Sequence, residues 1–234
     1  MPHPSQQIRF CRSRDGTRIA YAAAGAGLPM VKAANWVTHL DHDWQSPAWR
    51  PWLTMLTHRH RLIRYDPRGV GLSDRDNIVF SFEKYVEDLE AVVDAAGHEQ
   101  FVLFGFAGGG AIAVAYAARH PERVSQLVLY GSFVRGRFAR STTPEQLEEE
   151  QTLLRLMEMG WGKDEPSFRQ LFVSQFLPDG TAEQFRSFND MMRLSVSPKN
   201  AAGLMGAWFA ADVSTVAPLV RCPTRVHHVV EGSE

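Results

Sequence analysis

A glycine-rich stretch at residues 105–110 reads Gly-Phe-Ala-Gly-Gly-Gly and stands between an apolar run and a helix of small residues. A strand, a sharp turn and a helix in this order present a serine nucleophile when the turn reads G-x-S-x-G. Here the central position is Ala107, whose methyl group cannot attack a carbonyl carbon. The stretch therefore predicts the geometry of an acyl-transfer site without its nucleophile.

The glycines of this stretch indicate that the turn itself is kept. Glycine is needed where the backbone turns sharply and where two elements approach closely. The residue after the nucleophile position is Gly108, and its backbone amide would stand at the start of the following helix. Amides at a helix N-terminus favour anions and polarised carbonyl groups. We expect the amide of Gly108 to keep this property despite the loss of the hydroxyl group.

The elements that position this turn alternate between strands and helices along the first part of the chain. The apolar strands and the helices between them favour a mostly parallel sheet that is covered on both faces. Two strands around Asp15-Gly16 are expected to form an antiparallel edge. The expected strands then cover 29–35, 60–66, 100–106 and 124–133, and the expected helices cover 46–58, 81–97 and 108–120.

From about residue 138 the pattern changes to helices only. Thr143 and Thr181 are each followed three residues later by glutamine, which is the pattern of a capping box at the start of a helix. A helical insert after a sheet strand predicts a lid over the strand ends. We therefore divide the chain into a core of residues 1–137 and 214–234 and a helical lid of residues 138–213.

The composition narrows the classes of partner. The 234 residues carry a formal net charge of −1, which gives no electrostatic reason to expect nucleic acid or an anionic membrane as a partner. No apolar run approaches the length of a membrane span. The first ten residues lack the pattern of a secretory signal, and the only cysteines are Cys11 and Cys222. A cytoplasmic protein without disulfides is expected.

Other groups of reactive side chains have simpler interpretations. Residues 39–43 contain two histidines and two aspartates, a set that can bind metal ions, but a hydrogen-bonded loop is the favoured interpretation. Ser132 follows a strand but has no base placed for it. His227 and His228 point to opposite faces if they lie in a strand, so at most one could reach the site. We expect no metal and no cofactor.

Several longer motifs resemble one family. The stretch YDPRGVGLSD at residues 65–74 and the stretches SRDGTRIAYAAAG and SFEKYVEDLEAVVDAAG resemble the α/β-hydrolase fold superfamily. The similarity is greatest to the α/β-hydrolase domains found alone or fused to bacterial transcriptional regulators and adenylate cyclases, and it covers about residues 6–224. The resemblance implies a doubly wound, mostly parallel sheet with an inserted helical lid. Asp66 and Arg68 are expected to brace neighbouring loops.

The resemblance also implies catalytic machinery, which is a serine, a histidine and an acid with two backbone amides as oxyanion hole. The nucleophile position matches Ala107, and one oxyanion amide matches Gly108. The other amide matches Trp36 or Val37, and the two remain alternatives. Phe106 and Trp36 are expected to line the substrate pocket. The tryptophans at positions 44, 49 and 52 either line the approach to it or belong to the core.

The two remaining members of the triad have no clear match. The family's acid aligns with Gly232, beside Glu231. The family's histidine lies beyond a further strand and helix, and this chain ends before that point. We therefore expect the last strand and covering helix of the fold to be missing from a truncated chain, through a natural terminus, a frameshift or a cloning junction.

Three functions follow from these expectations. The first is a carboxylic-ester hydrolase of Ser-His-Asp type that is inactive or very weakly active because of Ala107. The second is a module that binds a small acyl or ester-like ligand without turnover. The third is an interaction protein that forms a homodimer through an exposed sheet edge.

Overall fold

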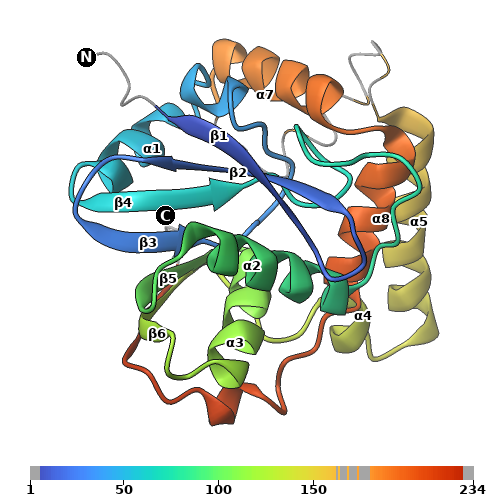
Figure 1. Cartoon of the computed structure of the whole chain (residues 1–234). Coiled ribbons are helices and arrows are strands. Elements are labelled where there is room, and N and C mark those ends of the chain that lie inside the picture. The colour runs from blue at the N-terminus through green and yellow to red at the C-terminus, as the bar shows by residue number, and fades with distance from the viewer. Residues whose placement is uncertain (1–5, 162, 164–167, 169–172, 174–179, 229–234) are drawn as a thin grey trace, which may run out of the picture.

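The computed structural model describes residues 6–161, 163, 168, 173 and 180–228. A seven-stranded sheet runs through the described part of the chain in the order β1-β2-β4-β3-β5-β6-β7 (Figure 1). The strands are β1 (Gln7–Arg12), β2 (Arg18–Ala24), β3 (Leu28–Lys32), β4 (His60–Tyr65), β5 (Phe101–Phe106), β6 (Val124–Tyr130) and β7 (Thr224–His227). The pairs β1-β2 and β2-β4 are antiparallel, and all other pairs are parallel. The expected mostly parallel sheet with an antiparallel edge is confirmed.

Helices cover both faces of this sheet. Helices α2 and α3 pack together on one face, and α1 packs beside β4 on the other (Figure 1). The described helices are α1 (Arg50–Thr57), α2 (Phe82–Ala96), α3 (Gly109–Arg119), α4 (Arg137–Arg140), α5 (Pro144–Gly160), α7 (Ala182–Ser195) and α8 (Pro198–Phe209), with short 3-10 helices η1 (His42–Trp44) and η2 (Ala217–Leu219).

Alternate residues of the central strands belong to two separate cores. Val31, Ile63 and Leu103 join the cluster that contains the apolar side chains of α2 and α3. Their chain neighbours Met30 and Leu62 join a second cluster with residues of α1. Because successive strand residues point to opposite faces, both faces of the sheet are buried, as the uninterrupted apolar strands predicted.

Helices α4, α5, α7 and α8 follow β6 and lie together beside the sheet (Figure 1). The expected capping box at Thr181 is confirmed, because its side chain accepts from the amide of Gln184 and the Gln184 side chain accepts from the amide of Thr181. At Thr143 only the first of these bonds is present, and the Gln146 side chain accepts from Thr142 instead. The division into core and lid at residues 138 and 213 remains a prediction.

The first covering helix begins later than the sequence predicted. Helix α1 starts at Arg50 rather than at Ser46. The Ser46 hydroxyl accepts from the amides of Ala48 and Trp49, at 3.3 and 3.5 Å, within a turn that precedes the helix. The expected capping residue thus satisfies the amides of a turn, and the proline near the helix start is Pro51.

Asp66 braces the loops that surround the site, as the resemblance implied. Its buried carboxylate accepts from the Thr38 hydroxyl at 2.7 Å. It also accepts from the backbone amides of Leu40 at 3.2 Å and Leu72 at 3.0 Å. The loop after β3 and the loop after β4 are therefore tied to one another.

Arg68 joins the same loop to helix α2 and to the first hairpin. Its side chain is fully buried and bonds both carboxylate oxygens of Asp88, at 2.6 and 2.8 Å. It also bonds Asp15 at 2.8 Å and holds the pKa of that carboxyl well below its usual range. The expected structural role of Arg68 is confirmed.

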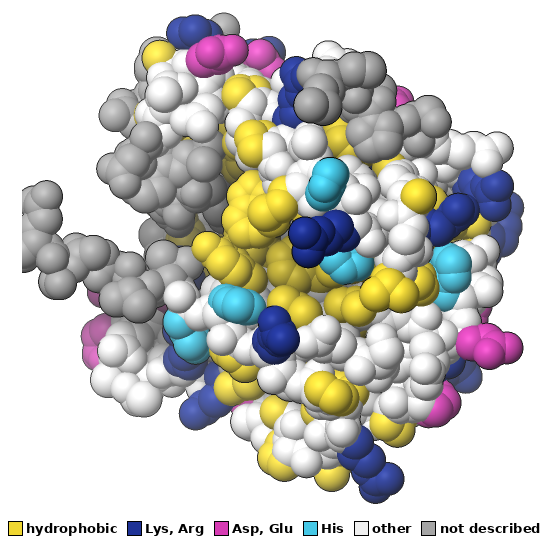
Figure 2. Space-filling model, turned by 90° about the vertical axis from the view of Figure 1, so that its left-hand side faces the viewer, with side chains coloured by type: hydrophobic (Ala, Val, Ile, Leu, Met, Phe, Trp, Pro, Cys, Tyr) yellow, Lys and Arg dark blue, Asp and Glu magenta, His cyan; other side chains and the backbone are white. Residues whose placement is uncertain are grey.

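One face of the molecule gathers hydrophobic side chains near its middle, with histidine, lysine and arginine side chains around them (Figure 2). Strand β7 forms one edge of the described sheet, opposite β1, and all four of its residues are exposed. A homodimer through this edge remains a prediction. Within the described residues, no helix combines the length and the apolar character that crossing a membrane requires.

Candidate functional site

The site is built on the turn between β5 and α3. Ala107 has a φ of +47°, in the left-handed region that residues with a side chain rarely adopt. Its amide donates to the carbonyl oxygen of Tyr130 at 3.0 Å, and its own carbonyl oxygen accepts from Gly110 at 3.0 Å. The sharp strand-to-helix turn predicted from the glycine-rich stretch is therefore present with alanine at its apex.

The glycines around Ala107 are required by close packing. A Cβ atom on Gly105 would lie 2.6 Å from the Cα of Gly110. A Cβ atom on Gly109 would lie 2.7 Å from the carbonyl oxygen of Ala34, which belongs to the loop after β3. These approaches pack β5 against α3 and α3 against the loop after β3, so the shape of the turn does not depend on the side chain at position 107.

Ser132, which follows β6, contacts the residues on both sides of this turn. Its hydroxyl donates to the carbonyl oxygens of Gly105, at 3.2 Å, and Tyr130, at 3.3 Å, and it lies where a Cβ atom of Gly110 would be. Ser132 does not line the cavity described below. We assign it a packing role rather than that of a replacement nucleophile.

The backbone at position 107 leads to a testable prediction. We expect Ala107→Gly to stabilise the protein by up to about 1 kcal/mol. A left-handed conformation costs a residue with a Cβ atom roughly 1–2 kcal/mol, and the greater flexibility of unfolded glycine offsets about 0.5–1 kcal/mol of that gain. Urea unfolding measures the change. The exposed helical control Ala95→Gly should lose about 1 kcal/mol, and an equal loss for Ala107→Gly would contradict the prediction.

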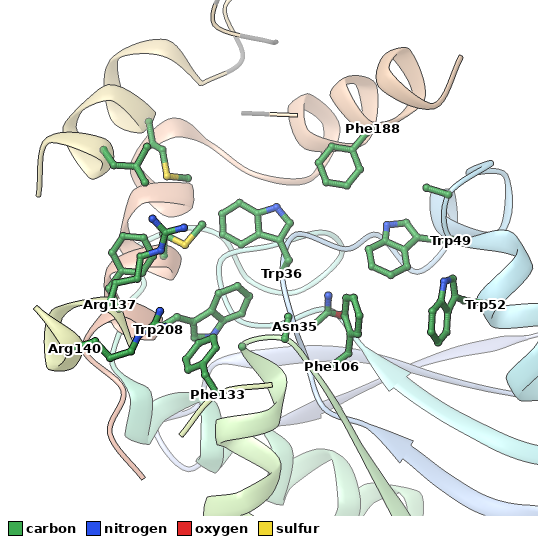
Figure 3. Close-up of a pocket in the computed structure, with 17 residues that line it drawn as sticks. Asn35, Trp36, Trp49, Trp52, Phe106, Phe133, Arg137, Arg140, Phe188 and Trp208 are labelled. Carbon is green, nitrogen blue, oxygen red and sulfur yellow. The ribbon is translucent and has the colours of Figure 1, made fainter. Parts of the chain in front are cut away.

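A cavity of about 380 Å³ opens beside Ala107, within the size range of small-molecule sites. Its walls come from the loop after β3, helix α1, the turn after β5, and helices α4, α5, α7 and α8 (Figure 3). The 17 lining residues are Asn35, Trp36, Ala48, Trp49, Trp52, Phe106, Ala107, Gly108, Phe133, Arg137, Arg140, Leu153, Met157, Phe188, Met205, Trp208 and Phe209. An apolar ligand body fits this lining, because aromatic and aliphatic side chains dominate it.

Four of the site residues predicted from the sequence line this cavity, namely Trp36, Phe106, Ala107 and Gly108. The fifth, Val37, is fully buried and does not line it. Of the two alternatives for the second oxyanion amide, we therefore favour Trp36.

The expected tryptophans divide between cavity and core. Trp49 and Trp52 line the cavity beside Phe106, at ring-centroid distances of 6.1 and 6.0 Å from it. Trp44 is buried in the core, and its indole N–H donates to Gln6 at 2.8 Å. The cavity therefore has an aromatic end formed by residues before and after the start of α1.

Trp208 of α8 covers the amide that follows the nucleophile position. A Cβ atom on Gly108 would lie 2.9 Å from the Trp208 ring. The Trp208 ring also packs against Trp36, with centroids 5.4 Å apart. The Trp208 ring thus contacts both Gly108, which is buried, and the side chain of Trp36.

A buried lysine holds the amide side chain of Asn35 at the cavity wall. The Lys32 ammonium group donates to Asn35 Oδ1, and burial lowers the pKa of Lys32 to about 8. This bond occupies the Asn35 oxygen and leaves its Nδ2 hydrogens for other partners. Asn35 is therefore a candidate donor to a ligand carbonyl group.

The described lining contains no group that could act as a general base. None of the 17 described lining residues is a histidine, an aspartate or a glutamate, and the only ionisable ones among them are Arg137 and Arg140. His227 and His228 do not line the cavity, and His227 packs on Tyr130 with ring centroids 6.4 Å apart. The expected positions of the acid, Glu231 and Gly232, lie outside the described residues.

Residues 39–43 form a hydrogen-bonded loop. Asp43 pairs with Arg64 at 2.7 Å, and the amide of His42 donates to His39 at 3.4 Å. Among the described residues, no three metal-ligating side chains come together. These contacts agree with the structural interpretation of this segment.

Comparison with known proteins shows to which family the chain belongs. A family model described as alpha/beta hydrolase fold matches residues 34–219, which include the turn at Ala107 and all 17 residues of the cavity lining. The chain belongs to this family. The alpha/beta hydrolase fold also relates it to solved structures. The esterase EaEST from Exiguobacterium antarcticum aligns with 94% of this chain and 80% of its own, at a TM-score of 0.75 and 21% identity, which shows a shared fold.

The proteins that are similar to this chain in sequence have several different activities. The chain is 36% identical over 118 residues to 2-hydroxymuconate semialdehyde hydrolase from a Pseudomonas species, covering 50% of this chain and 41% of the relative. It is 32% identical over 136 residues to a non-heme chloroperoxidase from Streptomyces lividans, covering 57% of this chain and 48% of the relative. The chain thus matches about half the length of these relatives.

Several cavity residues were not predicted from the sequence. Trp208, Arg137 and Arg140 come from helices distant from the glycine-rich stretch, and only the folded chain brings them beside it. The two arginines are spaced three apart, beginning seven residues after the end of β6. That spacing was the one local signal that could have placed them on a common face.

Proposed function

We propose that this chain is an ester-binding domain of carboxylic-ester hydrolase type that does not turn its ligand over in the present sequence. The observation that supports it best is Ala107 at a φ of +47° on the wall of an apolar cavity. The backbone that would present a nucleophile is retained, while the side chain is a methyl group. The esterase that shares this fold agrees with the proposed ligand class.

The residues at the turn would act on an ester as follows. The carbonyl oxygen is held by the backbone amides of Gly108 and Trp36, and the side-chain amide of Asn35 is a further donor. Such donors polarise a carbonyl group and stabilise negative charge on its oxygen. In a serine hydrolase a hydroxyl group at position 107 would attack the carbonyl carbon, and a histidine would take the proton. With Ala107 no bond forms, and the ester remains bound and intact.

An ester assay tests this proposal. The chain and Ala107→Ser are incubated with 4-nitrophenyl butyrate beside a buffer control, and ligand binding is followed by the fluorescence of the cavity tryptophans. We expect saturable binding at one site in both proteins and at most a slow release of 4-nitrophenol by the Ala107 chain, with no burst. Oxyanion stabilisation and binding alone contribute at most roughly 10³–10⁴-fold over water.

The Ala107→Ser variant is expected to gain little hydrolytic activity. A general base contributes about 10²–10⁴-fold to such reactions, and the described cavity lining offers none. Rapid turnover by Ala107→Ser alone would contradict the absence of a base. Equal turnover by both proteins, well above buffer, would overturn the assignment of position 107, and no saturable binding in either would overturn the proposed function.

A further inference from the structure

The charged side chains of the cavity are of one sign. Arg137 and Arg140 are three residues apart on α4, and both line the cavity. No aspartate or glutamate stands among the described lining residues. An apolar cavity that contains only cations has a local preference for a ligand that carries negative charge.

One of the two arginines is already paired. Arg137 bonds Glu150 at 3.2 Å and lies over the Phe209 ring at 5.1 Å. Arg140 lies over the Phe133 ring at 5.9 Å, and no described carboxylate is within 4.0 Å of it. Both arginines are exposed. Among the described residues, the pair therefore brings one positive charge without a carboxylate partner to the edge of the cavity, over an aromatic ring.

The cavity has two different ends. Figure 3 shows Trp49 and Trp52 at one end and Arg137 and Arg140 at the other, with Asn35 between them. A ligand that spans the cavity therefore meets aromatic rings at one end, polar donors near its middle and guanidinium groups at the far end.

We propose that Arg140, supported by Arg137, is a subsite for a carboxylate, so that the ligand is an apolar ester with a carboxylate at one end. This inference rests on the proposed function. A planar guanidinium group matches a carboxylate with two parallel hydrogen bonds. A singly charged carboxylate also matches the one uncompensated charge, whereas a phosphate dianion would leave negative charge unpaired.

The volume sets the size of this ligand. A cavity of about 380 Å³ lies near the lower end of the roughly 300–1,000 Å³ range of small-molecule sites, which favours a ligand of one ring with a short chain. A monoester of a short dicarboxylic acid, or a short acyl ester of a hydroxybenzoic acid, is of this size. The dicarboxylic monoester has its carboxylate on the acyl side of the ester bond. The hydroxybenzoate ester has it on the alcohol side.

The test uses the Ala107 chain, in which the ester should remain intact. Dissociation constants are measured by calorimetry for phenyl pentanoate, for the phenyl monoester of glutaric acid and for 4-(pentanoyloxy)benzoate. We expect at least one of the carboxylates to bind about ten-fold more tightly than the neutral ester. Arg140→Gln should remove that preference, and it should weaken the binding of the carboxylates far more than the binding of phenyl pentanoate. High salt should reduce the preference as well, because it screens exposed charges.

A matched control, Arg135, lies two residues before α4. Arg135 is exposed, pairs with Asp212 at 3.6 Å and does not line the cavity, so Arg135→Gln should leave all three affinities unchanged. The carboxylate subsite is overturned if neither carboxylate binds more tightly than phenyl pentanoate, or if Arg135→Gln and Arg140→Gln have equal effects. Binding of phenyl pentanoate in that case leaves the proposed function in place, whereas failure of all three esters to bind overturns both.

Discussion

Ala107→Cys is expected to make this chain react once with an activated ester and then stop. A cysteine is a few per cent thiolate at neutral pH and is intrinsically nucleophilic, so it needs less help from a base than serine does. Position 107 immediately precedes the N-terminus of α3, where the pKa of a thiol is lowered. The amide of Gly108 would stabilise the oxyanion. With 4-nitrophenyl butyrate we expect a burst of one equivalent of 4-nitrophenol.

The burst should not be followed by turnover. Hydrolysis of the acyl-enzyme requires an activated water molecule, and the described cavity lining offers no histidine or carboxylate to activate it. The measurement is stopped-flow absorbance together with the intact mass of the protein, which should gain one butyryl group. Cysteine adopts the same backbone conformation as alanine, so it should not add strain at this φ.

Two native cysteines have to be excluded as the source of the burst. Burial raises the pKa of Cys11 to about 11, which makes it a poor nucleophile. Cys222 is only half-buried, so the experiment is done on Cys222→Ser with Ala107 as the control. An equal burst from that control would assign the reaction elsewhere. Absence of a burst while the ester still binds would show that the ligand carbonyl does not reach position 107.

The serine and cysteine variants test different parts of the site. Ala107→Ser tests for a base, because a neutral hydroxyl group must lose its proton to attack. Ala107→Cys tests the turn, the oxyanion amide and the position of the ester, because the thiolate forms without a positioned base. A burst from cysteine and no gain from serine would place the defect in the proton-transfer groups and not in the cavity.

The parts of the site that the sequence predicted depend on local rules. The glycines around Ala107 are informative because only glycine permits the close approaches of β5, α3 and the loop after β3. The parallel strands were recognisable because uninterrupted apolar runs are typical of a sheet buried on both faces. The fold and the position of the turn could therefore be read without knowledge of tertiary contacts.

The rest of the site depends on contacts between distant segments. Trp208 covers Gly108 across a separation of 100 residues, and nothing in the residues around Trp208 indicates that contact. Likewise, nothing in the residues around the two arginines of α4 indicates that they line a cavity. Local capping signals were only partly right where several polar groups compete. Ser46 satisfies a turn before α1. Thr143 caps α5 by accepting from the Gln146 amide, but the Gln146 side chain bonds Thr142 instead of returning to Thr143.

Asp88→Ala is expected to destabilise the fold by about 3 kcal/mol or more. Asp88 and Arg68 are both fully buried and joined by two hydrogen bonds of 2.6 and 2.8 Å. Removal of one partner of such a pair leaves an uncompensated buried charge, which costs roughly 3–5 kcal/mol. Asp15 remains beside Arg68 and keeps the loss near the lower end of that range. At roughly 2–4 °C per kcal/mol for a chain of this size, the melting temperature should fall by about 6–12 °C.

The same helix supplies the control. Glu83 of α2 forms a similar two-bond pair with Arg119, at 2.6 and 2.7 Å, but both side chains are largely exposed. Exposed pairs contribute roughly 0–1 kcal/mol, so Glu83→Ala should change the stability little. Arg68→Met combined with Asp88→Leu should be less destabilised than Asp88→Ala alone, because no buried charge is left without a partner. If instead Asp88→Ala and Glu83→Ala were equally mild, burial would not be what makes the Arg68 pair important. The loop that carries Asp66 and Arg68 would then owe its position to its backbone contacts.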